Sequence, residues 1–306
     1  MISVIVPARD AAATLANALV ALAGQRGAPE FEVIVVDSGS RDETPLIAQR
    51  AGVRLLYNPG GEPASSRNLG VEHAHGRWLA FTDADCTPRP DWLAAGVRAL
   101  ATAELVQGVV RPAGPAGPFD RTVSVGAEHG LYETANLFVS RSVFERAGGF
   151  APVPGLDIGT GQPFGEDAWF AWRARRGGAR SRFAADAVVD HAVFPRGARA
   201  WIAERGRGRY FPPLVALIPE LRCTFLCGRV FLSPASLRFD LAVAGSLLAA
   251  GRRRPEWALA AVPYALDVVN GGRRHGRRYP LAQLAADGVT LAALLRGSIS
   301  ARSAVL

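Results

Sequence analysis

Residues 77–86 read RWLAFTDADC, and this stretch decides how the first half of the chain is interpreted. Trp78–Phe81 is a short apolar run, which is typical of a buried strand. Asp83 and Asp85 follow it directly. In an extended segment, residues i and i+2 point to the same side, so the two carboxylates can converge on a hard cation such as Mg²⁺ or Mn²⁺. The alternative is that one of them caps the helix that follows Pro88–Asp91.

Apolar strands alternate with helices on both sides of this stretch. Strands are expected at residues 2–6, 31–36, 53–57, 77–81 and 134–140, and helices at 11–23, 42–50, 65–75, 91–103, 141–147 and 164–178. This alternation predicts an α/β fold with a Rossmann-like, mostly parallel sheet flanked by helices. Ligands of such sheets bind at the carboxyl ends of the strands, where Arg9, Asp37, Asp83 and Asp85 fall.

Charge divides the chain near residue 190. The 306 residues carry a net charge of +8, and every basic residue is Arg. Residues 1–190 hold 18 Arg against 21 acids, a net of −3, whereas residues 191–306 hold 17 Arg against 6 acids, a net of +11. The chain therefore changes from balanced to strongly basic, which indicates an anionic partner or a solvated rim for its last third.

Several protein classes are disfavoured by the composition. The N-terminus lacks a basic segment followed by a long apolar run, so no signal peptide is expected. No stretch reaches the roughly 18–20 uninterrupted apolar residues of a spanning helix, and the longer runs contain Asp267 or Asp287. Cys86, Cys223 and Cys227 form no even disulfide framework, which favours a reducing, cytoplasmic location.

Four further positions carry candidate chemistry. Asp37 leaves a strand on a Ser-Gly turn, where it can accept a hydrogen bond from a uracil base or close an Asx turn. Arg67 can pair with phosphate or lie on a helix surface. Glu166 and Asp167 begin a helix, where they can complement its dipole or supply a general base. His191 is either structural or a third metal ligand facing the two aspartates.

Five segments in this order resemble the family-2 glycosyltransferases with the A-type glycosyltransferase (GT-A) fold. They are ISVIVPARD, VIVVDSGSRDET, ASSRNLG…GRWLAFTDADC, ANLFVSRSVFERAGGF and GEDAWFAWR. The likeness covers roughly residues 1–195. It implies a catalytic, nucleotide-sugar-binding domain at residues 1–199, followed by a helical extension at residues 200–306.

The resemblance also implies site residues. The donor-binding residues would be Pro7, Ala8, Arg9, Asp37, Arg67, Asp83 and Ala84. Asp83 and Asp85 would bind the metal, Mn²⁺ or Mg²⁺. His191 is the candidate for a third ligand from its own position in the sequence, and not from the resemblance.

Asn136 would belong to the acceptor-side wall, and the pair Glu166-Asp167 would provide catalysis, with Asp167 as the base. One departure is visible, because Ser38 stands where the family often has a second acid.

The activity implied is metal-dependent transfer of a sugar from a nucleotide-diphosphate sugar to an acceptor hydroxyl, with inversion at the anomeric carbon. A UDP-sugar is the favoured donor and a GDP-sugar the alternative. A sugar-nucleotide nucleotidyltransferase is disfavoured, since VPARDAAATL lacks the Gly-rich, basic signature of that class. A non-catalytic membrane-associated protein of the same fold is disfavoured by the retention of Asp83, Asp85 and Asp167.

The basic last third predicts three apolar helices, at about residues 236–250, 256–269 and 281–297. Arg clusters and aromatic residues border them, a pattern that suits an anionic membrane surface. The helices could equally pack on the catalytic domain or on a second subunit of a homo-oligomer. No nucleic-acid-binding motif is present, so nucleic acid is not expected as a partner. The expected location is peripheral, at the cytoplasmic face of a membrane.

Overall fold

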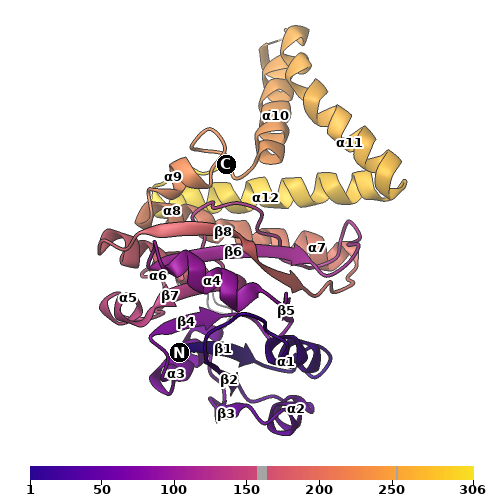
Figure 1. Cartoon of the computed structure of the whole chain (residues 1–306). Helices are drawn as coiled ribbons and strands as arrows, with labels where there is room; N and C mark the ends of the chain where they lie inside the picture. Colours follow the sequence, from indigo (N-terminus) through magenta and orange to yellow (C-terminus); the bar gives the residue numbers. More distant parts are fainter. Residues whose placement is uncertain (157–163, 253) are drawn as a thin grey trace. The chain divides into compact units, whose positions relative to one another are not determined.

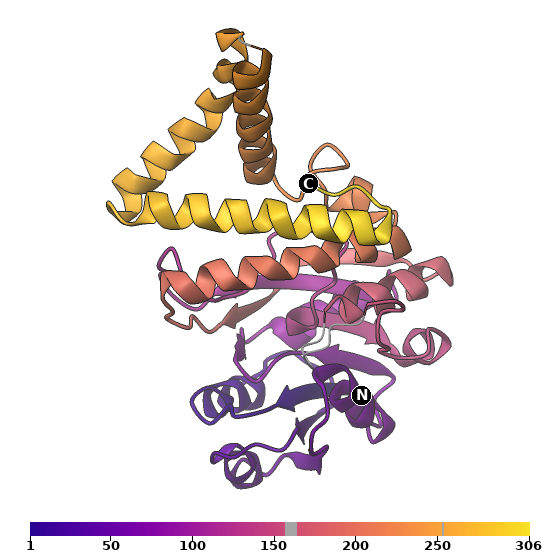
Figure 2. The ribbon, with the colours of Figure 1, turned by 180° about the vertical axis from the view of Figure 1, so that it is seen from behind.

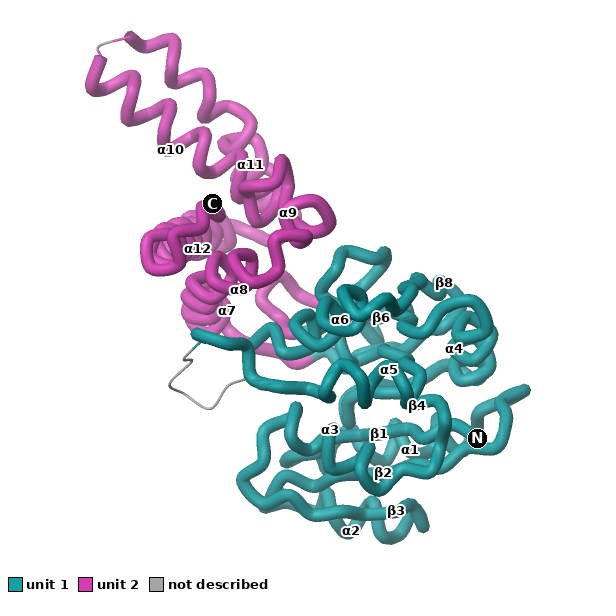
Figure 3. Tube along the Cα trace, turned by 90° about the vertical axis from the view of Figure 1, so that its left-hand side faces the viewer, with its two compact units in different colours: residues 1–115, 122–193 teal, residues 116–121, 194–306 magenta. Residues whose placement is uncertain are grey.

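The computed structural model describes residues 1–156, 164–252 and 254–306, and the chain divides into two compact units (Figure 3). The first unit comprises residues 1–115 and 122–193, and the second comprises residues 116–121 and 194–306. The short segment 116–121 therefore belongs to the second unit, although the residues before and after it belong to the first.

The first unit is built on one eight-stranded sheet (Figure 1). Its strands are β1 (Ile2–Ala8), β2 (Phe31–Asp37), β3 (Arg54–Tyr57), β4 (Trp78–Phe81), β5 (Cys86–Pro88), β6 (Leu105–Pro112), β7 (Leu137–Ser140) and β8 (Ser181–His191). They are ordered β3-β2-β1-β4-β7-β6-β8-β5. Strands β1 to β4 are mutually parallel, whereas β7 runs antiparallel to both of its neighbours. The predicted α/β sheet is confirmed, and it is mixed.

Six helices cover this sheet. They are α1 (Leu15–Ala23), α2 (Thr44–Arg50), α3 (Pro63–Glu72), α4 (Trp92–Leu100), α5 (Arg141–Arg146) and α6 (Glu166–Arg176). The predicted strand at 134–140 begins only at Leu137, because Thr134–Asn136 forms a 3₁₀ turn, η1. Strands β5, β6 and β8 were not predicted, since β5 has three residues and Gly and polar residues interrupt the other two.

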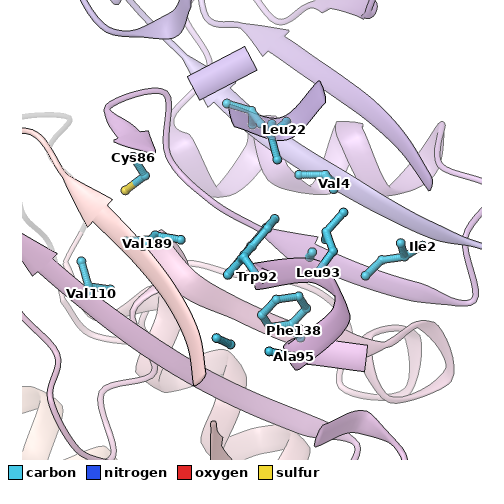
Figure 4. Close-up of a cluster of buried hydrophobic side chains, with 14 of the residues drawn as sticks. Ile2, Val4, Leu22, Cys86, Trp92, Leu93, Ala95, Val110, Phe138 and Val189 are labelled. Atoms are coloured by element: carbon cyan, nitrogen blue, oxygen red, sulfur yellow. The ribbon is translucent and has the colours of Figure 1, made fainter. Parts of the chain in front are cut away.

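The period of two along β1 assigns its side chains to two buried faces. Ile2, Val4 and Val6 join the core cluster that contains residues of α1 and α4 (Figure 4). Ile5 faces the other side, where it meets α3 so closely that a Cβ on Gly70 would lie 2.6 Å from it. Because β1 is covered on both faces, it has the continuous apolar sequence of an interior strand.

The second unit is helical. Its helices are α7 (Ala198–Glu204), η2 (Arg205–Tyr210), α8 (Phe211–Leu217), α9 (Leu221–Thr224), α10 (Pro234–Arg252), η3 (Pro255–Ala261), α11 (Val262–His275) and α12 (Tyr279–Ala301). The three predicted apolar runs correspond to α10, to η3 with α11, and to α12. Helices α10, α11 and α12 follow one another along the chain and form the sides of a triangle (Figure 2).

Helix α12 is the one element among the described residues with the length and composition to cross a bilayer, and 22% of its apolar window is buried. Its C-terminal half packs on η2, since a Cβ on Gly297 would lie 2.2 Å from the carbonyl oxygen of Arg209. It carries Asp287 and Arg296 within its length, so its apolar run is interrupted as the sequence indicated.

Candidate active site

Arg9, Asp37 and Asp83 lie at or just beyond the carboxyl ends of β1, β2 and β4, which are neighbours in the sheet. Ala8 pairs with Asp37 at the ends of β1 and β2, and β4 leads directly into Asp83. Parallel strands bring their carboxyl ends to one edge, so residues far apart in the sequence meet there. The sequence predicted this convergence from the order of the strands.

Asp37 is almost fully buried, with 2% of its surface exposed, and its carboxylate closes the turn that follows β2. It accepts hydrogen bonds from the backbone N–H groups of Gly39 and Ser40 and from the hydroxyl of Ser40. These hydrogen bonds form an Asx turn, which is one of the two alternatives that the sequence offers for Asp37. Arg9, one residue beyond β1, is exposed at the same edge, while Pro7 and Ala8 are paired within the sheet.

The loops after β1 and β2 are held together by side chains that the sequence did not single out as site residues. The backbone N–H of Asp10 donates to Ser40 Oγ at 2.9 Å, and that of Ala12 donates to Asp42 Oδ2 at 2.9 Å. Hydrogen bonds from Thr44 and Ala12 lower the pKa of Asp42. A run of Ser, Asp and Thr after a buried strand is the signal that could have indicated this pairing of loops.

A buried hydroxyl pair connects the end of β2 with α3. Ser38 Oγ lies 2.8 Å from Ser66 Oγ, and both side chains are buried. The next residue of α3 is Arg67, so the same contact fixes where the guanidinium emerges. Ser38, which departs from the family pattern, therefore connects the end of β2 with α3.

Arg67 is buried between two carboxylates. Its Nη2 lies 2.8 Å from Asp83 Oδ1, and its Nη1 lies 3.8 Å from Asp167 Oδ1, although only 5% of the residue is exposed. Burial alone would lower the pKa of Arg67, but Asp83 and Asp167 outweigh it and raise the pKa. The alternative of a surface cation on a helix is thus wrong, because the side chain joins the turn after β4 to the start of α6.

Asp167 is held by Thr134. The backbone N–H and the hydroxyl of Thr134 both donate to Asp167 Oδ2, at 3.0 and 2.9 Å. Burial raises the pKa of Asp167, while Arg67 and the two bonds from Thr134 oppose that rise. Its Oδ1 makes no hydrogen bond to any described residue. Thr134 therefore fixes one carboxylate oxygen, and the other is buried beside Arg67.

Two further carboxyl groups surround this aspartate. Burial, together with the charge of Asp167, raises the pKa of Glu166 to about 7 and that of Glu133 to about 7. Glu133 was not predicted as a site residue. It directly precedes the segment Thr134–Asn136, and this position next to a candidate site residue is the signal that could have indicated it.

The segment that carries Asp83 and Asp85 is a turn, and the expectation of an extended segment is wrong. The N–H of Cys86 donates to the carbonyl of Asp83 at 3.0 Å, and Ala84 and Asp85 occupy the turn. The carboxylates therefore diverge, since Asp83 faces Arg67 whereas Asp85 Oδ1 lies 3.5 Å from His191 Nε2.

Among the described residues, Asp85, Cys86 and His191 form a group whose ligand atoms all lie within 4.8 Å of one another. Burial and the nearby aspartates raise the pKa of the Cys86 thiol well above its ordinary value, so it remains a protonated, apolar neighbour. The carboxylate of Asp85 is a donor that suits Mn²⁺ or Mg²⁺, whereas the imidazole of His191 is more typical of Zn²⁺, Fe²⁺ and other transition metals.

The orientation of His191 fits a ligand role. Its Nδ1 lies 2.7 Å from the carbonyl oxygen of Ala192, which can only accept a hydrogen bond, so Nδ1 is the donor. The lone pair of the neutral ring is then on Nε2, which faces Asp85. This is the arrangement in which histidine binds metals, with the other nitrogen donating to a carbonyl group. The donor set is therefore compatible with a divalent cation.

Asn136 lies inside the sheet and not on an acceptor-side surface, because none of its surface is exposed. Its amide donates to the carbonyls of Val109 and Ala187 at 2.8 and 2.9 Å, and its oxygen accepts from Trp92 Nε1 at 2.8 Å. Val109 and Ala187 flank the shift in register between β6 and β8. The residue thus fixes the course of β8 toward His191, which differs from the expected contact with an acceptor.

A cavity of about 470 Å³ opens elsewhere in the first unit, between α4 and β8. Its walls include Arg98, Arg182 and Asp186, and none of the candidate site residues lines it. This cavity is therefore separate from the candidate site at the strand ends.

Comparison with known proteins places these motifs in a family. The model of "Glycosyl transferase family 2" matches residues 3–153. Glycosyltransferase AglE of Haloferax volcanii is 30% identical over 215 residues, which cover 64% of this chain and 68% of that protein. The pre-mycofactocin glycosyltransferase of Mycobacterium tuberculosis is 27% identical over 72% of this chain. The match covers 48% of that relative, or about half of its length.

Solved structures show the same fold. The mannosyltransferase PcManGT from Pyrobaculum calidifontis, in complex with GDP-Man and Mn²⁺, superposes with a TM-score of 0.62 at 23% identity, covering 97% of this chain and 86% of that one. S. aureus TarS 1–349 in complex with UDP-GlcNAc superposes with a TM-score of 0.52 at 17% identity, covering 99% of this chain and 92% of that one. These similarities establish the GT-A fold, and together with the sequence matches they show that the chain belongs to glycosyl transferase family 2 and is a glycosyltransferase.

Proposed function

We propose that the protein is an inverting glycosyltransferase that moves a sugar from a nucleotide-diphosphate sugar to an acceptor hydroxyl with the help of Mn²⁺ or Mg²⁺. The observation that carries this proposal is the convergence of Arg67, Asp83 and Asp167 beside Asp85 and His191. These residues come from four segments of the chain: α3, the turn after β4, α6 and the end of β8. A packing role alone does not require so many titratable groups at one sheet edge.

A nucleotide-sugar donor is supported by the neighbours, one of which is in complex with GDP-Man and one with UDP-GlcNAc. In this chain the loops after β1 and β2 would bind the nucleotide, with Arg9 and the turn at Asp37 at their edge. UDP is the favoured nucleotide and GDP the alternative. Asp83, Ala84 and Arg67 would face the diphosphate.

Asp85 and His191 would hold the cation, and Asp83 would stand beside it. When bound, a divalent cation supplies positive charge that stabilises the departing diphosphate. The chain's own contribution is to fix the ligands, with Nδ1 of His191 committed to the carbonyl of Ala192.

Asp167 would act as the general base. Its carboxylate would take the proton of the acceptor hydroxyl while the hydroxyl oxygen bonds to the anomeric carbon. The bond from that carbon to the diphosphate breaks on the opposite face, and the leaving group takes the electron pair. Attack from the face opposite the leaving group inverts the configuration. Glu166, with its raised pKa, would remain partly protonated beside the base near neutral pH.

A panel of UDP-, GDP- and dTDP-sugars, each with and without Mn²⁺, tests the proposal. The true donor should raise the melting temperature by mass action and should be consumed when Mn²⁺ is present. Nuclear magnetic resonance of the product should show an inverted anomeric centre. A retained configuration would contradict the assignment of Asp167 as a base acting in a single displacement.

The metal assignment is tested by titrating Mn²⁺ against Asp85→Asn and His191→Gln. Loss of a ligand should raise the Mn²⁺ concentration needed for half-maximal activity by at least about 10–100-fold, because this is the cost of losing a residue that only hydrogen-bonds to a metal ligand. Asp186→Asn is the matched control, because this acid is exposed and pairs with Arg98 away from the candidate site. An unchanged Mn²⁺ dependence in Asp85→Asn would show that Asp85 is not a ligand.

The acceptor is proposed to lie at a membrane surface, at the cytoplasmic face, because the last third of the chain is basic and apolar. The acceptor hydroxyl would belong to a lipid-linked or another membrane-located molecule.

A further inference from the structure

Exposed apolar side chains are concentrated in the second unit. Of the fifteen large apolar residues that are exposed among the described ones, eleven lie between residues 241 and 299. Water-soluble surfaces carry such residues singly, whereas a concentration of them marks an interaction surface.

Helix α11 presents these residues as a continuous stripe. Val262, Leu266 and Val269 are 49%, 57% and 50% exposed, and their spacing of four and three residues places them on one helical face. Leu259 of η3 is 70% exposed and precedes them by three residues, and Trp257 is 44% exposed at the same end. We call Trp257, Leu259, Val262, Leu266 and Val269 the α11 stripe.

The opposite face of α11 is polar and faces its own unit. Tyr264 is buried, and its hydroxyl donates to Asp287 Oδ2 of α12 at 2.7 Å. Asp267 pairs with Arg238 of α10. A helix in water normally buries its apolar face and exposes its charged face. Helix α11 does the reverse, which is the polarity expected of a helix whose outer face meets an apolar medium.

Arginines border the stripe at both ends. Arg252 and Arg254 lie before it, and residues 273, 274, 277 and 278, all Arg, follow it, and each of these side chains is exposed. The segment 234–279 holds eight Arg against three acids, a net charge of +5. An apolar stripe flanked by cations matches the depth profile of an anionic bilayer, with acyl chains below the phosphate layer.

We infer that the hairpin formed by α10, η3 and α11 docks on an anionic lipid bilayer, with the α11 stripe in the acyl boundary and the flanking arginines at the phosphates. A second copy of the chain fits less well, because two such faces would bring net charges of +5 against each other. This inference extends the proposed membrane-located acceptor, but it requires neither a donor nor a cation.

Flotation of the full chain with vesicles tests the inference. Vesicles of phosphatidylcholine alone are compared with vesicles containing 30% phosphatidylglycerol, a composition of about the charge at which polybasic segments bind. The chain should float with the anionic vesicles and remain at the bottom with the neutral ones. Failure to float with anionic vesicles would overturn the inference and would leave the proposed catalysis untouched, since no sugar nucleotide is involved.

Two variants separate the apolar from the electrostatic contribution. L259S/V262S/L266S/V269S should reduce partitioning on the order of 100-fold or more, since each large apolar side chain loses its burial. Replacing the four arginines at 273, 274, 277 and 278 with Gln should reduce partitioning onto the anionic vesicles on the order of 100-fold. Added salt should also reduce this partitioning. Both sets are exposed, so circular dichroism and the melting temperature should match those of the unchanged chain.

Val20→Ser is the matched control, because Val20 is 74% exposed on α1 and lies outside the hairpin. It should float like the unchanged chain. Partitioning that the quadruple serine variant leaves unchanged would overturn the inference. A dimer in analytical ultracentrifugation that dissociates in that variant, with no flotation of the unchanged chain, would show that the stripe is a protein interface.

Discussion

The sheet unit and the hairpin of the helical unit distribute polarity in opposite ways. In β1, Ile2, Val4 and Val6 have no exposed surface, and the charged groups stand in the loops beyond the strand ends. In α11, Leu266 and Val269 are exposed, while Tyr264 and Asp267 face other helices of the unit. Composition alone does not distinguish these arrangements, because both segments are rich in apolar residues.

The difference indicates that the two units meet different surroundings. The sheet unit hides its apolar surface from water and uses its polar groups for a site at one edge. The hairpin leaves apolar surface on the outside, which in water costs free energy in proportion to its area. The same substitution should therefore change the free energy of unfolding much more in the sheet unit than in the hairpin.

The largest expected effect is on catalysis in the sheet unit. Asp167→Asn removes the proposed base but keeps the shape of the side chain, so kcat should fall by about 10³-fold, within the range for general-base catalysis. Donor binding, measured by thermal shift, should be retained. Retained turnover would show that Asp167 is not the base.

The next effect compares leucines in the two units. Leu93 of α4 has no exposed surface and belongs to the core cluster, so Leu93→Ala should lower the free energy of unfolding by about 3 kcal/mol. Leu266→Ala of α11 should change it by less than about 0.5 kcal/mol, since the side chain is exposed. Urea denaturation of both variants measures the contrast. A similar loss for both would mean that the stripe is buried in the protein in solution.

Asn136→Ala tests whether this residue supports the fold or contacts an acceptor. Removing the amide leaves the indole N–H of Trp92 and the carbonyls of Val109 and Ala187 without their partner. The free energy of unfolding should fall by about 3 kcal/mol, the scale of several unpaired buried groups. A stable variant with a raised KM for the acceptor alone would instead support the acceptor-side assignment.

The smallest effect concerns the pKa of Asp167. Thr134→Val removes the hydroxyl that donates to Asp167 Oδ2 but keeps the backbone donor. Because a hydrogen bond to the charged form lowers a carboxyl pKa, its loss should raise the pKa of Asp167. The base is active when deprotonated, so the acidic limb of the profile of kcat/KM against pH should move to higher pH.

Thr134→Ser keeps a hydroxyl at the same position and should restore the original pH profile. If Thr134→Val lowers activity equally at every pH, the residue acts only through packing, and its proposed effect on the base is wrong.

Much of the fold and part of the candidate site follow from local patterns. The apolar runs ending at Ala8, Asp37 and Phe81, and the helices between them, predicted a parallel group of strands with acids at one edge. Motif order also indicated Asp85, Asp167 and His191. These features are readable because strand period, helix spacing and turn residues act over a few positions along the chain.

Other features depend on residues distant in sequence, and the tertiary structure alone decided them. The turn at Asp83–Cys86 directs one carboxylate to Arg67 and the other to His191, and the burial of Asn136 follows from a register shift between β6 and β8. The apolar pattern of α11 likewise predicted a helix but not which face would be exposed. Which side chains are exposed depends on the surfaces that pack together in the folded protein. A periodic pattern shows that a helix has an apolar face, but it does not show what covers that face.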